Sequence, residues 1–156
     1  MTELFKKAKL EGINTAIDTS GEPFTMKEPF ISKFDELMKY TDLVLLDIKE
    51  IDDIKHRELT GKTNENILLL AEYLSKIQKP VWIRHVLIPT INDDEESLKS
   101  LRKFIDTLNN VENIEILPYH TYGVEKYKKL GIDYKLKGIE PPTKEQVELA
   151  NKILKG

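Results

Sequence analysis

The 156-residue sequence contains no cysteine. This absence excludes disulfide bonds, thiolate nucleophiles, and any iron–sulfur or zinc site that needs thiolates from this chain. Long apolar runs are also missing. The longest, residues 67–71, is far shorter than the ~20 residues that a membrane-spanning helix needs. Because no signal pattern is visible at the amino terminus either, we expect a cytoplasmic location.

Charge of one sign is not concentrated anywhere in the chain. The formal net charge is only −3, and the sequence has no basic block, which argues against nucleic-acid and membrane partners. Hydrophobic residues make up 40% and charged residues 33% of the chain, a composition that indicates a soluble globular protein. The length suits one core, so we predict a single domain over residues 1–156.

Four apolar segments are present, and each leads into polar or ionisable residues. They are residues 16–17 before Asp18, 44–46 before Asp47, 81–83 before Arg84, and 114–117 shortly before His120. Stripes of apolar residues with helical spacing lie between them, so the pattern predicts four parallel strands with crossover helices. Because parallel strands share one carboxyl edge, the polar residues are expected to meet there.

Four strands are too few to close a barrel, which usually takes about eight. We therefore expect an open, curved α/β sheet with two unpaired edges. The strand predicted at residues 13–17 forms one edge, where a partner strand or a missing segment is expected to pair. After the fourth strand, a loop rich in Tyr and Lys is predicted to run to Pro141 and Pro142, and Thr143 is predicted to cap a final helix.

The first two strand ends carry side chains suited to cations and polar ligands. Asp18 and Thr19 offer oxygens to a hard cation, a hydroxyl or an ammonium, although a turn stabilised by these side chains is an equally good interpretation. Asp47 and Lys49 are two positions apart, so they share a face and are suited to gripping a zwitterionic ligand. The alternative for this pair is a structural ion pair.

Arg84 is the strongest single candidate, because it interrupts an apolar strand and needs an anionic partner there. Asp18, Asp47 or a ligand carboxylate fits that role, and a structural Arg–Asp brace is the competing interpretation. His120 follows the fourth strand and becomes a candidate ligand contact. His85, the neighbour of Arg84, is expected on the opposite face of the sheet.

Taken in order, these segments resemble the carboxyl-terminal part of the radical S-adenosylmethionine (radical SAM) activases of glycyl radical enzymes. The resemblance covers residues 4–154 and is carried by residues 17–21, 42–49, 81–84 and 117–120. It implies a partial (β/α) barrel made of strands three to six of a (β/α)6 barrel. The domain would then be the carboxyl-terminal portion of that barrel, without the cluster-binding amino-terminal part.

The resemblance also implies a site at the strand ends. The residues implied to line the S-adenosylmethionine pocket are Asp18, Asp47, Lys49, Arg84 and His120. Asp18, Thr19 and Asp47, together with the Ile48 carbonyl, are implied to hold a monovalent cation. From the chemistry of the side chains, Arg84 or Lys49 is expected on the ligand carboxylate and His120 nearer the nucleoside.

The implied reaction is one-electron cleavage of S-adenosylmethionine to a 5′-deoxyadenosyl radical. The radical takes a hydrogen atom from a glycine of pyruvate formate-lyase or a related glycyl radical enzyme, a step of anaerobic glucose metabolism. The family uses a 4Fe-4S cluster held by three cysteines, and an electron donor of the flavodoxin or ferredoxin type.

This chain has no cysteine, so it offers neither a cluster ligand nor a catalytic residue, and we expect the isolated chain to be inactive. Truncation is the expected reason, and a natural half-barrel completed by a partner chain is the alternative. Residues 41–49 also resemble the phosphoacceptor strand of a response-regulator receiver, but the strand ending at residue 17 leads into a single acid where a receiver needs two. A non-catalytic half-barrel scaffold is a third possibility, against which Arg84 argues.

Overall fold

The computed structural model describes all residues from 1 to 156. Four parallel strands form one open sheet in the order β1-β2-β3-β4. Their bounds are β1 (Ala16–Thr19), β2 (Leu43–Asp47), β3 (Val81–Leu87) and β4 (Val111–Pro118). This sheet confirms the predicted fold class. The first strand ends two residues later than predicted, so that Asp18 and Thr19 are part of β1.

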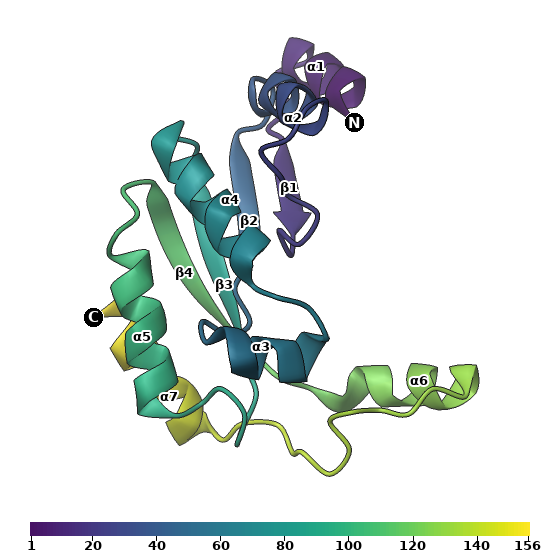
Figure 1. Cartoon of the computed structure of the whole chain (residues 1–156), viewed down its shortest axis with the longest axis vertical. Coiled ribbons are helices and arrows are strands. Elements are labelled where there is room, and N and C mark those ends of the chain that lie inside the picture. The colour runs from purple at the N-terminus through teal and green to yellow at the C-terminus, as the bar shows by residue number, and fades with distance from the viewer.

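The connections between the strands are helical. The helices are α1 (Thr2–Leu10), α2 (Phe30–Met38), α3 (Asp53–Thr60), α4 (Glu65–Lys76), α5 (Glu95–Ile105), α6 (Val124–Leu130) and α7 (Lys144–Lys155). In Figure 1, α4 and α5 lie along one face of the sheet, and α7 contacts α5 and β4. No helix in the structure is both long enough and apolar enough to span a membrane.

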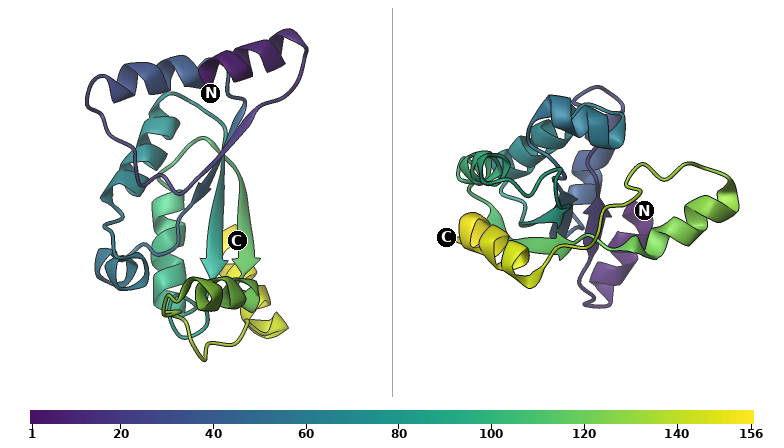
Figure 2. Two further views of the ribbon diagram at one scale, coloured as in Figure 1. Left: turned by 90° about the vertical axis from the view of Figure 1, so that its right-hand side faces the viewer. Right: turned by 90° about the horizontal axis from the view of Figure 1, so that it is seen from below.

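The two faces of the sheet differ because side chains alternate along each strand. In β3, Val81, Ile83 and Leu87 are buried under the helices, whereas Trp82 and Arg84 point to the other face and are half-buried. The buried face forms one hydrophobic core of 19 residues with the helices. No helix stands in front of β3 and β4 in the left view of Figure 2. Every second strand residue therefore lies on an open face.

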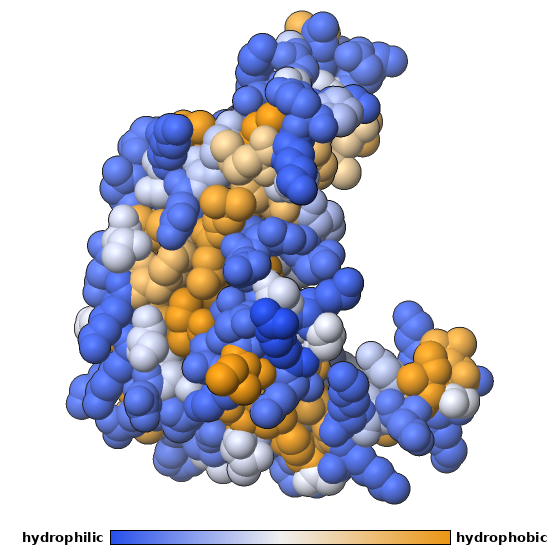
Figure 3. All heavy atoms as spheres, viewed as in Figure 1, coloured by the Kyte–Doolittle hydropathy of each residue, from blue (hydrophilic) through white to orange (hydrophobic).

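The segment after β4 differs from the predicted loop. It contains a short 3-10 turn (Thr121–Gly123) and helix α6, which has no buried residue. Figure 1 shows α6 extending away from the sheet, beyond the carboxyl ends of the strands. In Figure 3 the molecular outline is concave between the amino-terminal helices and α6. This arm, residues 121–142, therefore borders the open face at the end where the site residues lie.

Candidate functional site

Three of the candidate residues form an ion cluster on the open face. Arg84 lies opposite Asp47 in the register of β2 and β3. Its Nε donates to Asp47 Oδ1 at 2.8 Å, and its Nη2 lies 2.7 Å from the same oxygen. Nη2 also pairs with Asp18 of β1. One guanidinium thus bridges acids from two other strands.

The surroundings of this cluster decide which ligand charge it favours. The side chains of Arg84 and Asp47 are only 15% and 18% exposed, whereas that of Asp18 is 61% exposed. Burial lowers the pKa of Arg84, but the hydrogen bonds to Asp18 and Asp47 outweigh burial, and the pKa is raised overall. Two carboxylates against one guanidinium leave a formal charge of −1. The exposed side of Asp18 therefore favours a cationic group.

Lys49 and His120 are absent from this cluster and line a neighbouring pocket of about 900 Å³. Val86 of β3 and Leu117 of β4 contribute apolar walls to the same pocket. The Lys49 ammonium has no hydrogen-bond partner in the structure, so the alternative of a structural ion pair with Asp47 does not apply. Lys49 is thus free to receive an anionic group.

The cluster and the pocket adjoin one another on the open face. Arg84 and Val86 are alternate residues of β3, so they point to the same side about 6.6 Å apart along the strand. Arg84 belongs to the cluster, and Val86 lines the pocket. The structure therefore brings the five candidate residues to one end of one face, in two adjoining groups of different charge.

Thr19 does not join these groups. It follows Asp18 in β1 and faces the helix side, where it lines a separate, apolar cavity of about 430 Å³. Its hydroxyl accepts a hydrogen bond from the amide of Gly21 at 3.0 Å, as in the turn interpretation. The Ile48 carbonyl bonds His85 Nδ1 at 2.9 Å. The cation site stays a prediction, with only Asp18 and Asp47 close together among its expected side chains.

Tyr119, at the end of β4, and Tyr127 and Tyr134 of the arm line the pocket, a role that sequence reasoning did not assign. The hydroxyls of Tyr119 and Tyr134 are 2.8 Å apart, and the Tyr127 ring packs edge-on against Tyr134 at 5.0 Å. Burial and the Tyr119 hydrogen bond raise the pKa of Tyr134 to about 12. His120 lies 4.5 Å from the Tyr122 ring. The abundance of Tyr after β4 was the only signal in the sequence.

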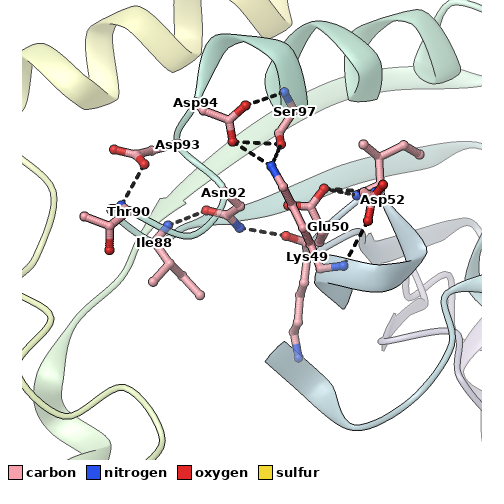
Figure 4. Close-up of polar contacts among 11 residues, drawn as sticks. Lys49, Glu50, Asp52, Ile88, Thr90, Asn92, Asp93, Asp94 and Ser97 are labelled. Carbon is pink, nitrogen blue, oxygen red and sulfur yellow. Dashed lines mark hydrogen bonds and ion pairs between the residues drawn. The ribbon is translucent and has the colours of Figure 1, made fainter. Parts of the chain in front are cut away.

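Buried polar side chains lie behind the strand ends, and sequence analysis did not predict the burial of Glu50 among them. His85 is buried on the face opposite to Arg84, as predicted, and burial lowers its pKa. Glu50 is buried too. Burial raises the pKa of Glu50, although its carboxylate accepts hydrogen bonds from the amides of Asp52 and Ile51. Figure 4 shows Glu50 beside Lys49, in the segment that follows β2.

Comparison with known proteins identifies the family. The model of the radical SAM superfamily matches residues 1–101. This chain belongs to the radical SAM superfamily. It is 53% identical over 154 residues to the pyruvate formate-lyase-activating enzyme of Listeria monocytogenes, which covers 99% of this chain and 62% of that protein. The Staphylococcus epidermidis enzyme of the same name is 53% identical over 150 residues, which cover 96% of this chain and 60% of that protein.

Solved structures of radical SAM proteins share the fold. A domain of a pyruvate-formate lyase-activating enzyme from Bacteroides vulgatus superposes with a TM-score of 0.77 at 26% identity, over 99% of this chain and 83% of that chain. Coproporphyrinogen III oxidase from Escherichia coli, a radical SAM enzyme, gives a TM-score of 0.62 at 12% identity. The match covers 99% of this chain and 36% of that chain. The chain spans about three fifths of the length of the curated relatives above.

Membership of the radical SAM superfamily implies S-adenosylmethionine and a 4Fe-4S cluster. The residues of this chain do not fit the cluster, because there is no cysteine and no group of three His, Asp or Glu placed to hold a metal. They do fit S-adenosylmethionine. This ligand carries a carboxylate, an ammonium and a sulfonium, and the open face offers the free Lys49 ammonium beside the acidic cluster.

Proposed function

We propose that the open face binds S-adenosylmethionine at the carboxyl ends of its four strands. In this proposal, residues 1–156 form one domain, the carboxyl-terminal portion of a radical SAM partial barrel without its cluster-binding part. The observation that carries the proposal is the pairing of two adjoining groups, an acidic cluster and a pocket that contains an unpartnered lysine. A zwitterion with an attached nucleoside matches both groups.

The geometry favours particular contacts for each part of the ligand. Lys49 is assigned to the carboxylate, because its ammonium is free while Arg84 already serves two acids. Of the two residues expected to contact the ligand carboxylate, Arg84 and Lys49, we therefore propose Lys49. Asp18 is assigned to the ammonium or the sulfonium, because it is the exposed acid of the cluster. His120 is assigned to the nucleoside, since it lies among the aromatic walls of the pocket.

The role of these residues is to bind and orient the ligand. When bound together with a reduced cluster, S-adenosylmethionine supplies the radical chemistry, which belongs to the cofactor. Lys49 and Asp18 would fix the two charged ends of its methionine part. Tyr119 and Tyr134, whose hydroxyls are 2.8 Å apart, both line the pocket and would shield one side of the nucleoside from water. No residue of this chain is assigned to bond breaking.

We further propose that the whole protein is an activase that installs a glycyl radical on pyruvate formate-lyase or a related enzyme, with a flavodoxin or ferredoxin type of electron donor. This is supported by 53% identity to enzymes named for activating pyruvate formate-lyase. The receiver interpretation is wrong, since the chain belongs to a different family.

Titration calorimetry of the 156-residue chain with S-adenosylmethionine tests the binding proposal. We expect binding at millimolar or lower concentration, and Lys49→Met is expected to weaken it about tenfold, the equivalent of roughly 1.4 kcal/mol. Lys62→Met is the matched control, because Lys62 is exposed and lies outside the pocket. Absence of binding by the unaltered chain, or equal effects of the two substitutions, would contradict the proposal.

A further inference from the structure

The segment that carries Lys49 is irregular, yet its carbonyl groups are held by side chains. β2 ends at Asp47 and α3 begins at Asp53. Between them, the carbonyl of Ile48 bonds His85 Nδ1, at 2.9 Å. The carbonyl of Ile51 accepts from the Asn64 amide at 2.7 Å. Buried backbone groups need such partners, and here they come from side chains instead of a neighbouring strand.

Asn92 holds the carbonyl of Lys49 itself. Its side chain is fully buried and uses both its donors and its acceptor. Nδ2 donates to the Lys49 carbonyl at 2.7 Å and to the Val86 carbonyl at 2.8 Å, while Oδ1 accepts from the Ile88 amide at 2.7 Å. One amide thus joins the exit of β2 to the end of β3, and a carboxylate of the same size has no donors with which to replace it.

The Lys49 side chain leaves this network in the opposite direction. In Figure 4 it runs away from Asn92 and ends at a nitrogen without any partner. That nitrogen belongs to a residue that lines the 900 Å³ pocket together with His120. Because nothing restrains the ammonium, the position of the Lys49 backbone sets the region that the side chain can reach.

We propose that Asn92 is a positioning residue for Lys49. It fixes the Lys49 backbone against β3, so that the ammonium is presented to the carboxylate of the ligand in the pocket. Fixing the backbone that carries this side chain before the ligand arrives reduces the ordering that binding has to impose. The inference rests on the proposed function, because it takes Lys49 as the partner of the ligand carboxylate.

Calorimetry with two ligands separates positioning from a general loss of structure. S-adenosylmethionine carries the carboxylate, whereas 5′-methylthioadenosine has the nucleoside without the amino acid. Asn92→Asp is expected to lower the affinity for S-adenosylmethionine about tenfold, because the Lys49 backbone is no longer fixed. The affinity for 5′-methylthioadenosine is expected to change by less than about twofold. Asn110→Asp is the matched control, since Asn110 is buried and donates to the Lys79 carbonyl at the amino end of β3.

A second variant and a double-mutant comparison complete the test. Asn92→Ser keeps one donor and is expected to show a smaller effect in the same direction. In a Lys49→Met background, Asn92→Asp is expected to cause no further loss of S-adenosylmethionine binding, because the side chain that it positions is gone.

The outcomes distinguish this inference from the proposed function. Equal weakening of both ligands by Asn92→Asp, or the same pattern in Asn110→Asp, would overturn the role of Asn92. Loss of folding in both Asn92 variants, monitored by circular dichroism, would also overturn it, because Asn92 would then support the whole sheet. If Lys49→Met leaves S-adenosylmethionine binding unchanged, the proposed contact of Lys49 fails instead, and the inference falls with it.

Discussion

Arg84 links the charge of the candidate site to the stability of the sheet. Its guanidinium is largely buried and bonds Asp47 of β2 and Asp18 of β1. Removing it leaves two carboxylates close together without a counter-charge, which is unfavourable for both. The same residue that shapes the ligand site therefore also joins three strands.

We predict that Arg84→Ala lowers the free energy of unfolding by about 1.5–3 kcal/mol, the range for hydrogen bonds to charged groups. Arg57→Ala is the control, because Arg57 pairs with Asp53 on an exposed helix surface, where such pairs contribute about 0–1 kcal/mol. Urea unfolding of both variants measures the difference. Equal losses would show that the Arg84 pairs behave as ordinary surface pairs.

The partners of Arg84 could be predicted from the sequence, since a charge in an apolar strand needs acids and the neighbouring strand ends supply them. The separation of Lys49 from Asp47 could not. This separation depends on the irregular path of the chain after β2. Buried side chains fix that path, among them Asn92, which bonds the Lys49 carbonyl from 43 positions further along the sequence. The position of Thr19 was missed because β1 extends two residues further than its apolar pattern indicates.

At the scale of elements, helix α5 begins at a charged cap. Asp94 accepts a hydrogen bond from the Ser97 amide at 2.9 Å, and its other oxygen lies 3.0 Å from Lys55 Nζ. The backbone hydrogen bond outweighs burial, and with the Lys55 and Ser97 side chains it lowers the pKa of Asp94 to about 2. In an unfolded chain the pKa is about 3.9. Asp94 therefore stabilises the fold above about pH 4, and this contribution is lost as the pH falls toward 2.

Asp94→Asn keeps a good helix cap but removes the charge. We predict that the unaltered chain is more stable than this variant at pH 6, and that the difference shrinks steadily between about pH 4 and pH 2 as Asp94 becomes protonated. Urea midpoints measured across this range test the prediction. A difference that stays constant with pH would mean that the Asp94 charge does not stabilise the helix.

The elements that pack on the sheet were predictable, because burial imposes a period of two on strands and a helical period on α4 and α5. Helix α6 was not. It buries no residue, and its three apolar positions, Val124, Tyr127 and Leu130, are too few to distinguish a helix from a loop rich in Tyr and Lys. The pocket wall that the arm contributes depends on where this helix lies, so it was missed as well.

At the scale of the whole molecule, the single core predicts one cooperative unfolding transition. The core of 19 buried residues joins β2, β3 and β4 with the helices, and Ile17 of β1 packs against it. The only tryptophan, Trp82, lies in β3. Tryptophan fluorescence and far-ultraviolet circular dichroism are therefore expected to give the same urea midpoint. A helical circular dichroism signal that persists at urea concentrations above the midpoint of the Trp82 fluorescence transition would contradict a single domain.

The central claim is that the ends of four strands form one binding face for S-adenosylmethionine. A nuclear magnetic resonance titration of the 15N-labelled chain tests it most directly, because every backbone amide reports separately. We expect saturable shift changes at Asp18, Asp47, Lys49, Arg84 and His120, with little change at the amino ends of the strands. Changes centred on the apolar cavity beside Thr19, or the absence of any saturable change, would contradict it.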